Sequence, residues 1–410
     1  MKSIPVVYRE GLKLLAYLSR LTLSNFRNLL ELDLRLPPGL IVFFGPNAQG
    51  KTTLLEAVYL LAIARSFRAE NEREVVNFQA ARDGGGALVG GVVAKGGEQL
   101  QVFVGYQCSR DPGAVETQPN GPASRSFPGR TVRKEIRVSR IRRTAAELVG
   151  LIPAVLFSAE DLRLVQGSPS DRRRFLDILI SQADPRYLKG LQRYQRVVQQ
   201  RNQLLRLLRD GRAGEDELAF WDEELVKEGS WISWRRQAAM EQLARVCAGH
   251  HRRLGGTDED LQLEYRPSAP LGEDLQATEG RFRQALAASG QRERAVLATA
   301  VGPHRDDFSL LVDGVDMGVF ASRGQARTLA LTLRLAEAAY LASARGEGPI
   351  VLLDDVLSEL DSDRRRRVLE QLTQYEQTLI TTTDPELMRG FFGTAAAYFR
   401  VSGGGVHSCQ

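Results

Sequence analysis

A short glycine-containing loop between an apolar run and a helical pattern constrains the fold of this chain more than any other feature. Residues 40–44 are wholly apolar, as expected of a strand buried on both faces, and 51–64 have the apolar spacing of a helix. The loop between them fits the pattern GxxxxGKT. Its residues are Gly45, Pro46, Asn47, Ala48, Gln49, Gly50, Lys51 and Thr52, and Thr53 follows. This order predicts an α/β fold with a phosphate-binding loop at a helix N-terminus.

The residue types in this loop indicate its chemistry. Glycines let successive backbone N–H groups turn toward a phosphate, and the N-terminus of a helix adds partial positive charge. We expect Lys51 to reach the outer phosphates of a nucleotide and the hydroxyl of Thr52 to hold Mg²⁺. The alternative is a chance glycine loop with a solvated lysine, which the strand–loop–helix context disfavours.

A second, acidic element agrees with this interpretation. Residues 350–353 are Ile, Val, Leu and Leu, and Asp354 and Asp355 follow them directly. An apolar strand that ends in two acids is typical of the Walker B element of P-loop ATPases. We expect Asp354 to orient Mg²⁺ through water and Asp355 to polarise the attacking water as the general base. An exposed acidic strand end is the alternative.

A third element stands immediately before a Leu/Ala-rich helical pattern at 329–342. It consists of Ser322, Arg323, Gly324 and Gln325. A hydroxyl, a glycine and an amide at this helix N-terminus form a second phosphate-binding device in the same chain. One nucleotide rarely needs both devices, but in two copies facing head to tail each copy would place this element on the other's nucleotide. The sequence therefore predicts an ATP-dependent homodimer, with a simple helix cap as the alternative.

Both halves of the chain also carry strand patterns. Alternating Leu residues at 30–36 and the runs 88–94 and 99–104 predict antiparallel strands. Asp313 and Gly314 predict a hairpin turn between strands at 308–312 and 315–319. The β structure is therefore mixed and comes from both ends of the chain.

The middle of the chain has a different character. The stretch 107–131 is rich in Pro and Gly, and its apolar residues show neither helical nor strand spacing. This composition predicts a flexible surface insertion. Leu-, Gln- and Arg-rich segments at 187–209 and 217–254 predict a helical hairpin. We therefore predict an α/β P-loop ATPase head with a mixed sheet, assembled from both chain ends around a helical insertion domain. The expected boundaries are an N-terminal extension at 1–16, a first ATPase part at 17–165, the helical insertion at 166–295 and a second ATPase part at 296–410.

Positive charge is concentrated in one block. Residues 133–209 carry 17 Lys and Arg against 7 Asp and Glu, a local net charge of +10, so the rest of the chain carries −5. Such a block is typical of a polyanion-binding face, and a solvated arginine-rich surface is the alternative. The candidate DNA contacts within it are Arg142, Arg143, Arg172, Arg173 and Arg174.

The cysteines and the hydropathy of the chain indicate the cellular compartment in which the protein is expected. The three cysteines, Cys108, Cys247 and Cys409, are far apart and form no metal-binding spacing, which fits a reducing compartment. No apolar run approaches the roughly 20 residues needed to span a bilayer. We expect a cytoplasmic protein without a membrane partner.

Several further motifs occur in a fixed order along the chain. They are LSNFRN at 23–28, NAQGKT at 47–52 followed by LLEA at 54–57, RSFR at 65–68, FSAEDL at 157–162, RRRFLD at 172–177, VGPHRDD at 301–307, SRGQ at 322–325 and LDDVLSELD at 353–361. This ordered set resembles the RecF family of bacterial recombination-mediator ATPases, which belong to the ABC class. The resemblance runs from about residue 17 to the C-terminus.

The resemblance implies a fold and an activity. It implies an ABC-type ATPase head that binds ATP and Mg²⁺, dimerises on ATP and is a weak, DNA-dependent ATPase. It also implies binding to gapped DNA and to junctions of single-strand and duplex DNA, and RecA loading together with RecO and RecR. By the same resemblance Arg27 belongs to the ATP-binding residues and Asp361 to the D-loop that crosses the dimer. Thr383 stands at the switch position, where many ABC ATPases have a histidine.

Some positions depart from the family pattern, and other classes of protein are considered beside it. Ala326 stands where the family usually has Gln, Ala159 stands where it usually has Pro, and neither 1–16 nor 107–131 has a recognised counterpart. The charged set at 302–307 either contacts the signature region or DNA, or is a solvated loop.

Another SMC-like or ABC-type ATPase is the main alternative, for example a transporter nucleotide-binding subunit, although the helical insertion with its basic flank fits a membrane partner poorly. An interaction protein with a decayed ATP site is disfavoured because Lys51, Thr52, Asp354 and Asp355 are all present. A small-molecule P-loop kinase would not need the element at 322–325.

Overall fold

The computed structural model describes residues 16–110, 130–255 and 258–409, which form two compact units. Among these residues, those up to Ala159 and those from Arg345 onward form the first unit, so two distant parts of the sequence contribute to it, and those from Glu160 to Ala344 form the second. The N-terminal extension predicted at 1–16 lies outside the described residues except for Ala16. Among the described residues, no helix has the length and apolar character needed to cross a membrane.

A mainly parallel sheet of the first unit joins the two chain ends. Its strand order is β15-β14-β3-β13-β12-β8, and only β15 runs antiparallel to its neighbour. The strands are β3 (Gly39–Phe44), β8 (Ala154–Phe157), β12 (Ile350–Asp354), β13 (Gln377–Thr382), β14 (Ala396–Ser402) and β15 (Gly405–Cys409). The apolar runs predicted at 40–44 and 350–353 are therefore both central strands.

An antiparallel sheet forms the second layer of this unit. Its order is β2-β1-β4-β5-β6-β7. The strands are β1 (Tyr17–Phe26), β2 (Leu29–Arg35), β4 (Gly86–Lys95), β5 (Glu98–Arg110), β6 (Arg130–Val138) and β7 (Ile141–Arg143). The insertion predicted at 107–131 is therefore shorter than expected, because β5 extends to Arg110 and β6 begins at Arg130; residues 111–129 lie outside the described ones.

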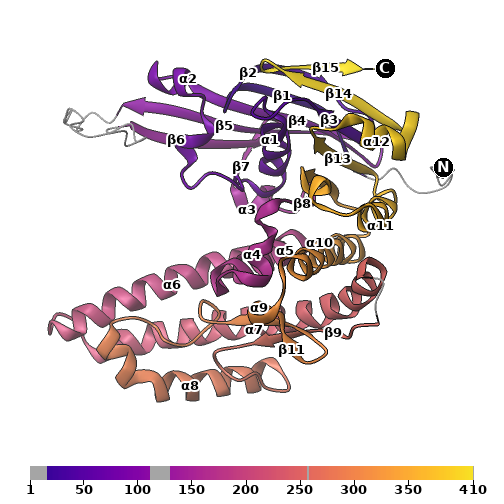
Figure 1. The fold of residues 1–410 in the computed structure, drawn as a ribbon. Coiled ribbons are helices and arrows are strands. Elements are labelled where there is room, and N and C mark those ends of the chain that lie inside the picture. Colours follow the sequence, from indigo (N-terminus) through magenta and orange to yellow (C-terminus); the bar gives the residue numbers. More distant parts are fainter. Residues whose placement is uncertain (1–15, 111–129, 256–257, 410) are drawn as a thin grey trace, which may run out of the picture. The chain divides into compact units, whose positions relative to one another are not determined.

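Helix α1 (Lys51–Ile63) lies between the two sheets (Figure 1). It contacts β4 and β5 of one sheet and β8, β12 and β13 of the other, and 11 of its 13 residues are buried. An apolar surface all around the helix is what such a central position requires. The smaller elements of the unit are α2 (Phe78–Arg82), α3 (Ala145–Leu148), α11 (Ser362–Leu372), α12 (Pro385–Phe392), η1 (Glu72–Val75), η3 (Val356–Glu359) and η4 (Gly393–Ala395).

The second unit is mainly helical and contains the predicted hairpin. The hairpin consists of α6 (Pro185–Arg209) and α7 (Glu215–Gly255), which pack against each other. The other elements are η2 (Ala159–Asp161), α4 (Leu162–Gln166), α5 (Pro169–Ala183), β9 (Leu261–Arg266), α8 (Leu275–Val296), β10 (Asp307–Val312), β11 (Val315–Asp316), α9 (Met317–Phe320) and α10 (Arg323–Arg345). Strands β11, β10 and β9 form a small antiparallel sheet.

The second unit differs from the prediction in two respects. The helical insertion was expected to end at 295, but the compact unit continues to Ala344 because β10 pairs with β9 and the ring of Phe308 packs 6.2 Å from that of Phe175. The strand expected at 315–319 ends at Asp316, whose side chain caps α9 by accepting from the N–H of Gly318. The signature segment therefore belongs to the helical unit.

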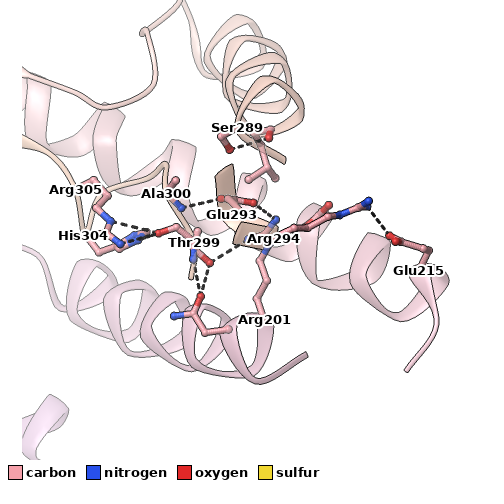
Figure 2. A network of polar contacts seen from close by, with 12 residues as sticks. Arg201, Glu215, Ser289, Glu293, Arg294, Thr299, Ala300, His304 and Arg305 are labelled. Atoms are coloured by element: carbon pink, nitrogen blue, oxygen red, sulfur yellow. Dashed lines mark hydrogen bonds and ion pairs between the residues drawn. The ribbon is translucent and has the colours of Figure 1, made fainter. Parts of the chain in front are cut away.

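A buried ionic cluster ties the hairpin to α8 (Figure 2). The guanidinium of Arg201 donates to Glu293 and to Asp222, both at 2.6 Å, and also to the hydroxyl of Thr299 at 3.1 Å. The side chains of Arg201 and Glu293 are only 3% and 1% exposed. Glu293 also accepts from the N–H of Ala300 at 2.7 Å, so the cluster fixes the segment that follows α8.

Removing the cation of this cluster should destabilise the second unit. Arg201→Met leaves Glu293 buried without its partner, and we expect a loss of about 3–5 kcal/mol in the free energy of unfolding. The three tryptophans all lie on α7, so urea unfolding followed by their fluorescence reports on this unit. Arg294→Met is the matched control: its pair with Glu215 is exposed and should contribute less than about 1 kcal/mol. Equal losses in the two variants would contradict this account of the cluster.

Candidate nucleotide-binding site

The loop between β3 and α1 has the backbone conformation of a phosphate cradle. Gly45, Ala48 and Gly50 have φ values of 150°, 63° and 108°. A Cβ at Gly45 would lie 2.2 Å from the carbonyl oxygen of Val401, so only glycine fits there. This close approach sets the start of the loop against β14, and the loop ends at the N-terminus of α1, where backbone N–H groups are free to bind an anion.

Lys51 is buried at the first position of α1 and points into the loop. Its ammonium donates to the carbonyl oxygens of Gly45 at 2.7 Å and Pro46 at 2.9 Å. Burial lowers the pKa of Lys51, and the negative charges of Asp355 and Asp354 act against that change. The loop thus holds the ammonium where it could reach a bound phosphate.

Thr52 meets the Walker B strand. Its hydroxyl donates to Oδ1 of Asp354 at 2.8 Å, across 302 positions of sequence, and Thr381 on β13 donates to the same oxygen at 2.9 Å. Burial raises the pKa of Asp354. A hydroxyl beside a desolvated carboxylate is a donor set that suits Mg²⁺, so these residues fit the expected metal.

Asp355 is held in an unusual conformation at the end of β12. Its φ is 53°, a left-handed value that is strained for a residue other than glycine, and its N–H donates to the hydroxyl of Thr381 at 3.0 Å. Its Oδ1 is buried and has no hydrogen-bond partner among the described residues. An acceptor with no partner at this position fits a carboxylate that binds water or substrate.

Two further loop residues contact neighbouring segments. The side-chain carbonyl of Gln49 accepts from the N–H of Gly403, in the turn between β14 and β15, at 2.8 Å. The hydroxyl of Thr53 donates to Oδ1 of Asn28 at 2.9 Å. The loop is therefore fixed on one side by the C-terminal hairpin and on the other by the segment that follows β1.

Arg27 is engaged by a glutamate that the sequence interpretation did not single out as a site residue. The guanidinium of Arg27 donates to Glu56 on α1, at 2.7 Å from Nη2, and to the carbonyl oxygen of Glu74 at 2.7 Å. Glu56 is fully buried, and it also accepts from the hydroxyl of Ser66 at 2.5 Å. Glu56 and Ser66 lie within the motifs LLEA at 54–57 and RSFR at 65–68. Their place in these motifs is the one feature of the sequence that could have pointed to them.

Comparison with known proteins identifies the family. A model of the RecF/RecN/SMC N-terminal domain matches residues 17–402. The DNA replication and repair protein RecF of Herpetosiphon aurantiacus is 42% identical over 375 residues, covering 90% of this chain and 93% of the relative. The chain belongs to the RecF family. The RecF protein of Roseiflexus castenholzii is 40% identical over 404 residues, covering 95% of this chain and 99% of its own length.

Solved structures of RecF proteins match nearly the whole chain. A structure of the recombination mediator protein RecF with ATP, in the RecFOR pathway, has a TM-score of 0.84 and 31% identity and covers 98% of this chain and 100% of that one. An Smc head domain from Pyrococcus furiosus has a TM-score of 0.50 and 14% identity over 96% of both chains, and it shares the fold alone. The predicted ABC-type ATPase head with a helical insertion is confirmed.

The signature segment of this RecF-family chain forms a capping box. The N–H of Ser322 donates to the side-chain carbonyl of Gln325 at 3.0 Å, and the N–H of Gln325 donates to the hydroxyl of Ser322 at 3.3 Å. Residues 322–325 are exposed, whereas Ala326, which departs from the family pattern, is fully buried. Both polar side chains thus cap α10, and their exposure leaves them accessible to a second molecule.

The D-loop and switch positions lie at the ends of elements in the first unit. Asp361 caps α11 by accepting from the N–H of Arg364 at 2.9 Å, and this hydrogen bond lowers the pKa of Asp361. Thr383 is exposed directly after β13.

The candidate DNA contacts fall into two groups. Arg172 forms a bidentate pair with Asp307 at 2.7 and 2.8 Å, and Arg173 donates to the carbonyl oxygen of Asp306 at 2.9 Å, so both are used inside the second unit. Arg174 is exposed. Exposed guanidinium groups also occur at Arg142, paired with Glu135 at 2.9 Å, and Arg143, paired with Glu147 at 3.0 Å.

Residues of the motif at 302–307 make contacts inside the second unit, which contradicts the solvated loop that was one of the two alternatives. Asp306 is 1% exposed, and its carboxylate accepts from Ser233, from the hydroxyl of Tyr265 and from the N–H of Ser268. The ring of His304 contacts the hydroxyl of Tyr194 at 2.6 Å. The motif therefore joins α6, α7 and β9 and is not a solvated loop.

Proposed function

We propose that this RecF-family protein is an ATP-dependent DNA-binding protein of recombinational repair and replication-fork maintenance. Its nucleotide would bind in the loop at 45–53, with Mg²⁺ held by Thr52 and Asp354. The observation that carries this proposal is the 2.8 Å hydrogen bond between those two residues, beside the buried ammonium of Lys51. Relatives named for DNA replication and repair, and a relative's structure with ATP, support it.

The residues divide the work of slow ATP hydrolysis. Lys51 neutralises the outer phosphates, and Asp355, with its unpartnered carboxylate oxygen, orients and deprotonates the attacking water. Mg²⁺ would screen the phosphate charge and so favour attack. Arg27 and Thr53, whose side chains contact Glu56 and Asn28, shape the flank of the nucleotide loop.

Dimerisation on ATP would complete the site. The exposed segment 322–325 at the start of α10 supplies a hydroxyl and a helix N-terminus, which suit the phosphates of the partner's nucleotide. By the family resemblance Asp361 belongs to the D-loop that crosses the dimer, and Thr383 stands at the switch position. ATP binding then acts as a dimerisation switch and hydrolysis as its release.

DNA binding would be electrostatic. Arg142 and Arg143 on β7, together with Arg174, offer exposed guanidinium groups, whereas Arg172 and Arg173 serve the interior of the second unit. By family resemblance the DNA is gapped or carries a junction of single-strand and duplex segments, and the partners are RecR, RecO and RecA.

The assignment of Lys51 and Asp355 is tested by two substitutions with different outcomes. Lys51→Ala should weaken ATP binding by more than about tenfold because the outer phosphates lose their cation. Asp355→Asn should leave binding intact and slow hydrolysis by roughly 10²–10⁴. Nucleotide titration and a steady-state ATPase assay measure the two effects. Full ATP affinity in Lys51→Ala would remove the nucleotide loop from this account.

The shared interface is tested at Ser322. Ser322→Arg should leave ATP binding by the monomer intact and abolish the ATP-induced dimer, because the longer side chain places bulk and misdirected charge at the partner's nucleotide. Ser322→Ala, which removes only the hydroxyl, should weaken the dimer less. Sedimentation with a non-hydrolysable ATP analogue measures both. A dimer of unchanged stability in Ser322→Arg would exclude a site shared by two subunits.

The DNA surface is tested by charge reversal. Replacing Arg142 and Arg143 together by Glu should weaken binding to all sequences and reduce the slope of log affinity against log salt by about 2, since each phosphate contact contributes roughly 0.9. Arg252→Glu, which reverses a charge on α7 in the second unit, is the control. An unchanged affinity and slope in the double variant would place the DNA site elsewhere.

A further inference from the structure

Thr381 lies on β13, the strand between β3 and β12, and is only 1% exposed. In the parallel pairing of β12 with β13 it stands opposite Asp354, the acid proposed to hold Mg²⁺. A hydroxyl at this depth needs hydrogen-bond partners within the protein. Thr381 has such partners at the acidic end of β12.

The hydroxyl of Thr381 is a donor and an acceptor at the same time. It donates to Oδ1 of Asp354 at 2.9 Å and accepts from the backbone N–H of Asp355 at 3.0 Å. The carbonyl oxygen of Leu353 lies farther from the hydroxyl, at 3.3 Å, so the single hydroxyl proton serves Asp354. One side chain therefore contacts both acidic residues of the proposed site.

The hydrogen bond to Asp354 restricts how that carboxylate can be used. Its Oδ1 also accepts from the hydroxyl of Thr52 at 2.8 Å, so this oxygen has two donors. A carboxylate oxygen has about two lone-pair sites, and the two hydroxyls fill them. Oδ2 is therefore the oxygen that is left for a further partner, such as a water bound to Mg²⁺.

The hydrogen bond from Asp355 helps to hold an unusual backbone conformation. The left-handed φ of 53° at Asp355 persists in a residue other than glycine only where its surroundings fix it. Here Thr381 accepts from its N–H, and the hydroxyl of Ser358 donates to its carbonyl oxygen at 2.8 Å. The backbone of Asp355 is thus fixed on both sides, and the buried Oδ1 of its side chain has no hydrogen-bond partner among the described residues.

We propose that Thr381 is a positioning residue for ATP hydrolysis, whose hydroxyl orients the Mg²⁺-binding carboxylate of Asp354 and holds the backbone of Asp355, the proposed general base. The proposal rests on the proposed function and deepens it. Because threonine is branched at Cβ, its side chain has few rotamers, and the hydroxyl is held between the two acidic residues. Residues that orient a metal ligand in this way usually contribute 10- to 100-fold, roughly, to metal affinity or activity.

Variants of the full chain that differ in this hydroxyl test the proposal. Thr381→Val keeps the branched shape of the side chain and removes the hydroxyl, whereas Thr381→Ser keeps the hydroxyl. Thr381→Val should weaken the binding of Mn²⁺, a probe for Mg²⁺, to the protein with a non-hydrolysable ATP analogue by about tenfold, measured by electron paramagnetic resonance. It should also slow ATP hydrolysis at saturating Mg²⁺ by roughly 10- to 100-fold. Thr381→Ser should retain most of both.

Thr378→Val is the matched control. Thr378 is a fully buried threonine on the same strand, and its hydroxyl donates to the carbonyl oxygen of Leu372 at 3.4 Å, away from the two acids. This variant loses a buried hydroxyl as Thr381→Val does, so it measures the general effect of such a loss on the melting temperature. It should leave Mn²⁺ binding and the rate of hydrolysis unchanged.

A purely structural role of Thr381 gives a different result. Thr381→Val then lowers the melting temperature but keeps the wild-type Mn²⁺ affinity and hydrolysis rate, which overturns the proposal. If Thr381→Val does not fold, Thr381→Cys replaces it, because a thiol is only a weak donor, and wild-type values in that variant overturn the proposal equally.

Failure of this proposal is distinguishable from failure of the proposed function. If Asp355→Asn stops hydrolysis while Thr381→Val keeps wild-type values, the assignment of Thr381 alone is wrong. If Asp355→Asn hydrolyses ATP at the wild-type rate and Lys51→Ala binds ATP normally, the proposed function itself fails.

Discussion

The hydrogen bond between Thr52 and Asp354 is the contact on which the site depends, because it joins two ends of the chain that are 302 positions apart. It forms only if β3 lies beside β13 and β12 lies on the other side of β13, in the observed parallel register. The nucleotide loop and the acidic strand end then meet at the carboxyl edge of one sheet, which is the usual place of ligands in open α/β sheets.

Because α1 is buried between the two sheets, each polar side chain on it needs a hydrogen-bond or charge partner within the protein. Most of its residues face apolar neighbours, so Lys51 and Glu56 are desolvated and must find partners close by. The ammonium of Lys51 donates to carbonyl oxygens of the loop, and the carboxylate of Glu56 accepts from Arg27 and Ser66. The same packing that stabilises the first unit thus fixes the charges of Lys51 and Glu56 on α1.

The sequence predicts the parts of this architecture that depend on local patterns. The loop at 45–52, the acidic end of β12 and the hairpin of α6 and α7 have strong periodic or motif signals. Contacts between residues far apart in the sequence have no such local signal. The hydrogen bond from Thr381 to Asp354 depends on the order of the strands in the sheet. The ion pair of Arg172 with Asp307 depends on packing within the second unit. The extent of the second unit was missed for the same reason, since the pairing of β9 with β10 draws residues beyond 295 into it.

A mixing experiment tests the central claim that two chains share each nucleotide site. Lys51→Ala impairs the loop and keeps the signature segment, whereas Ser322→Arg impairs the signature segment and keeps the loop. A heterodimer of the two has one site in which both elements are intact. We predict that ATP hydrolysis is negligible for either variant alone and reappears when they are mixed. A mixture that stays as inactive as its components would contradict a site built from two subunits.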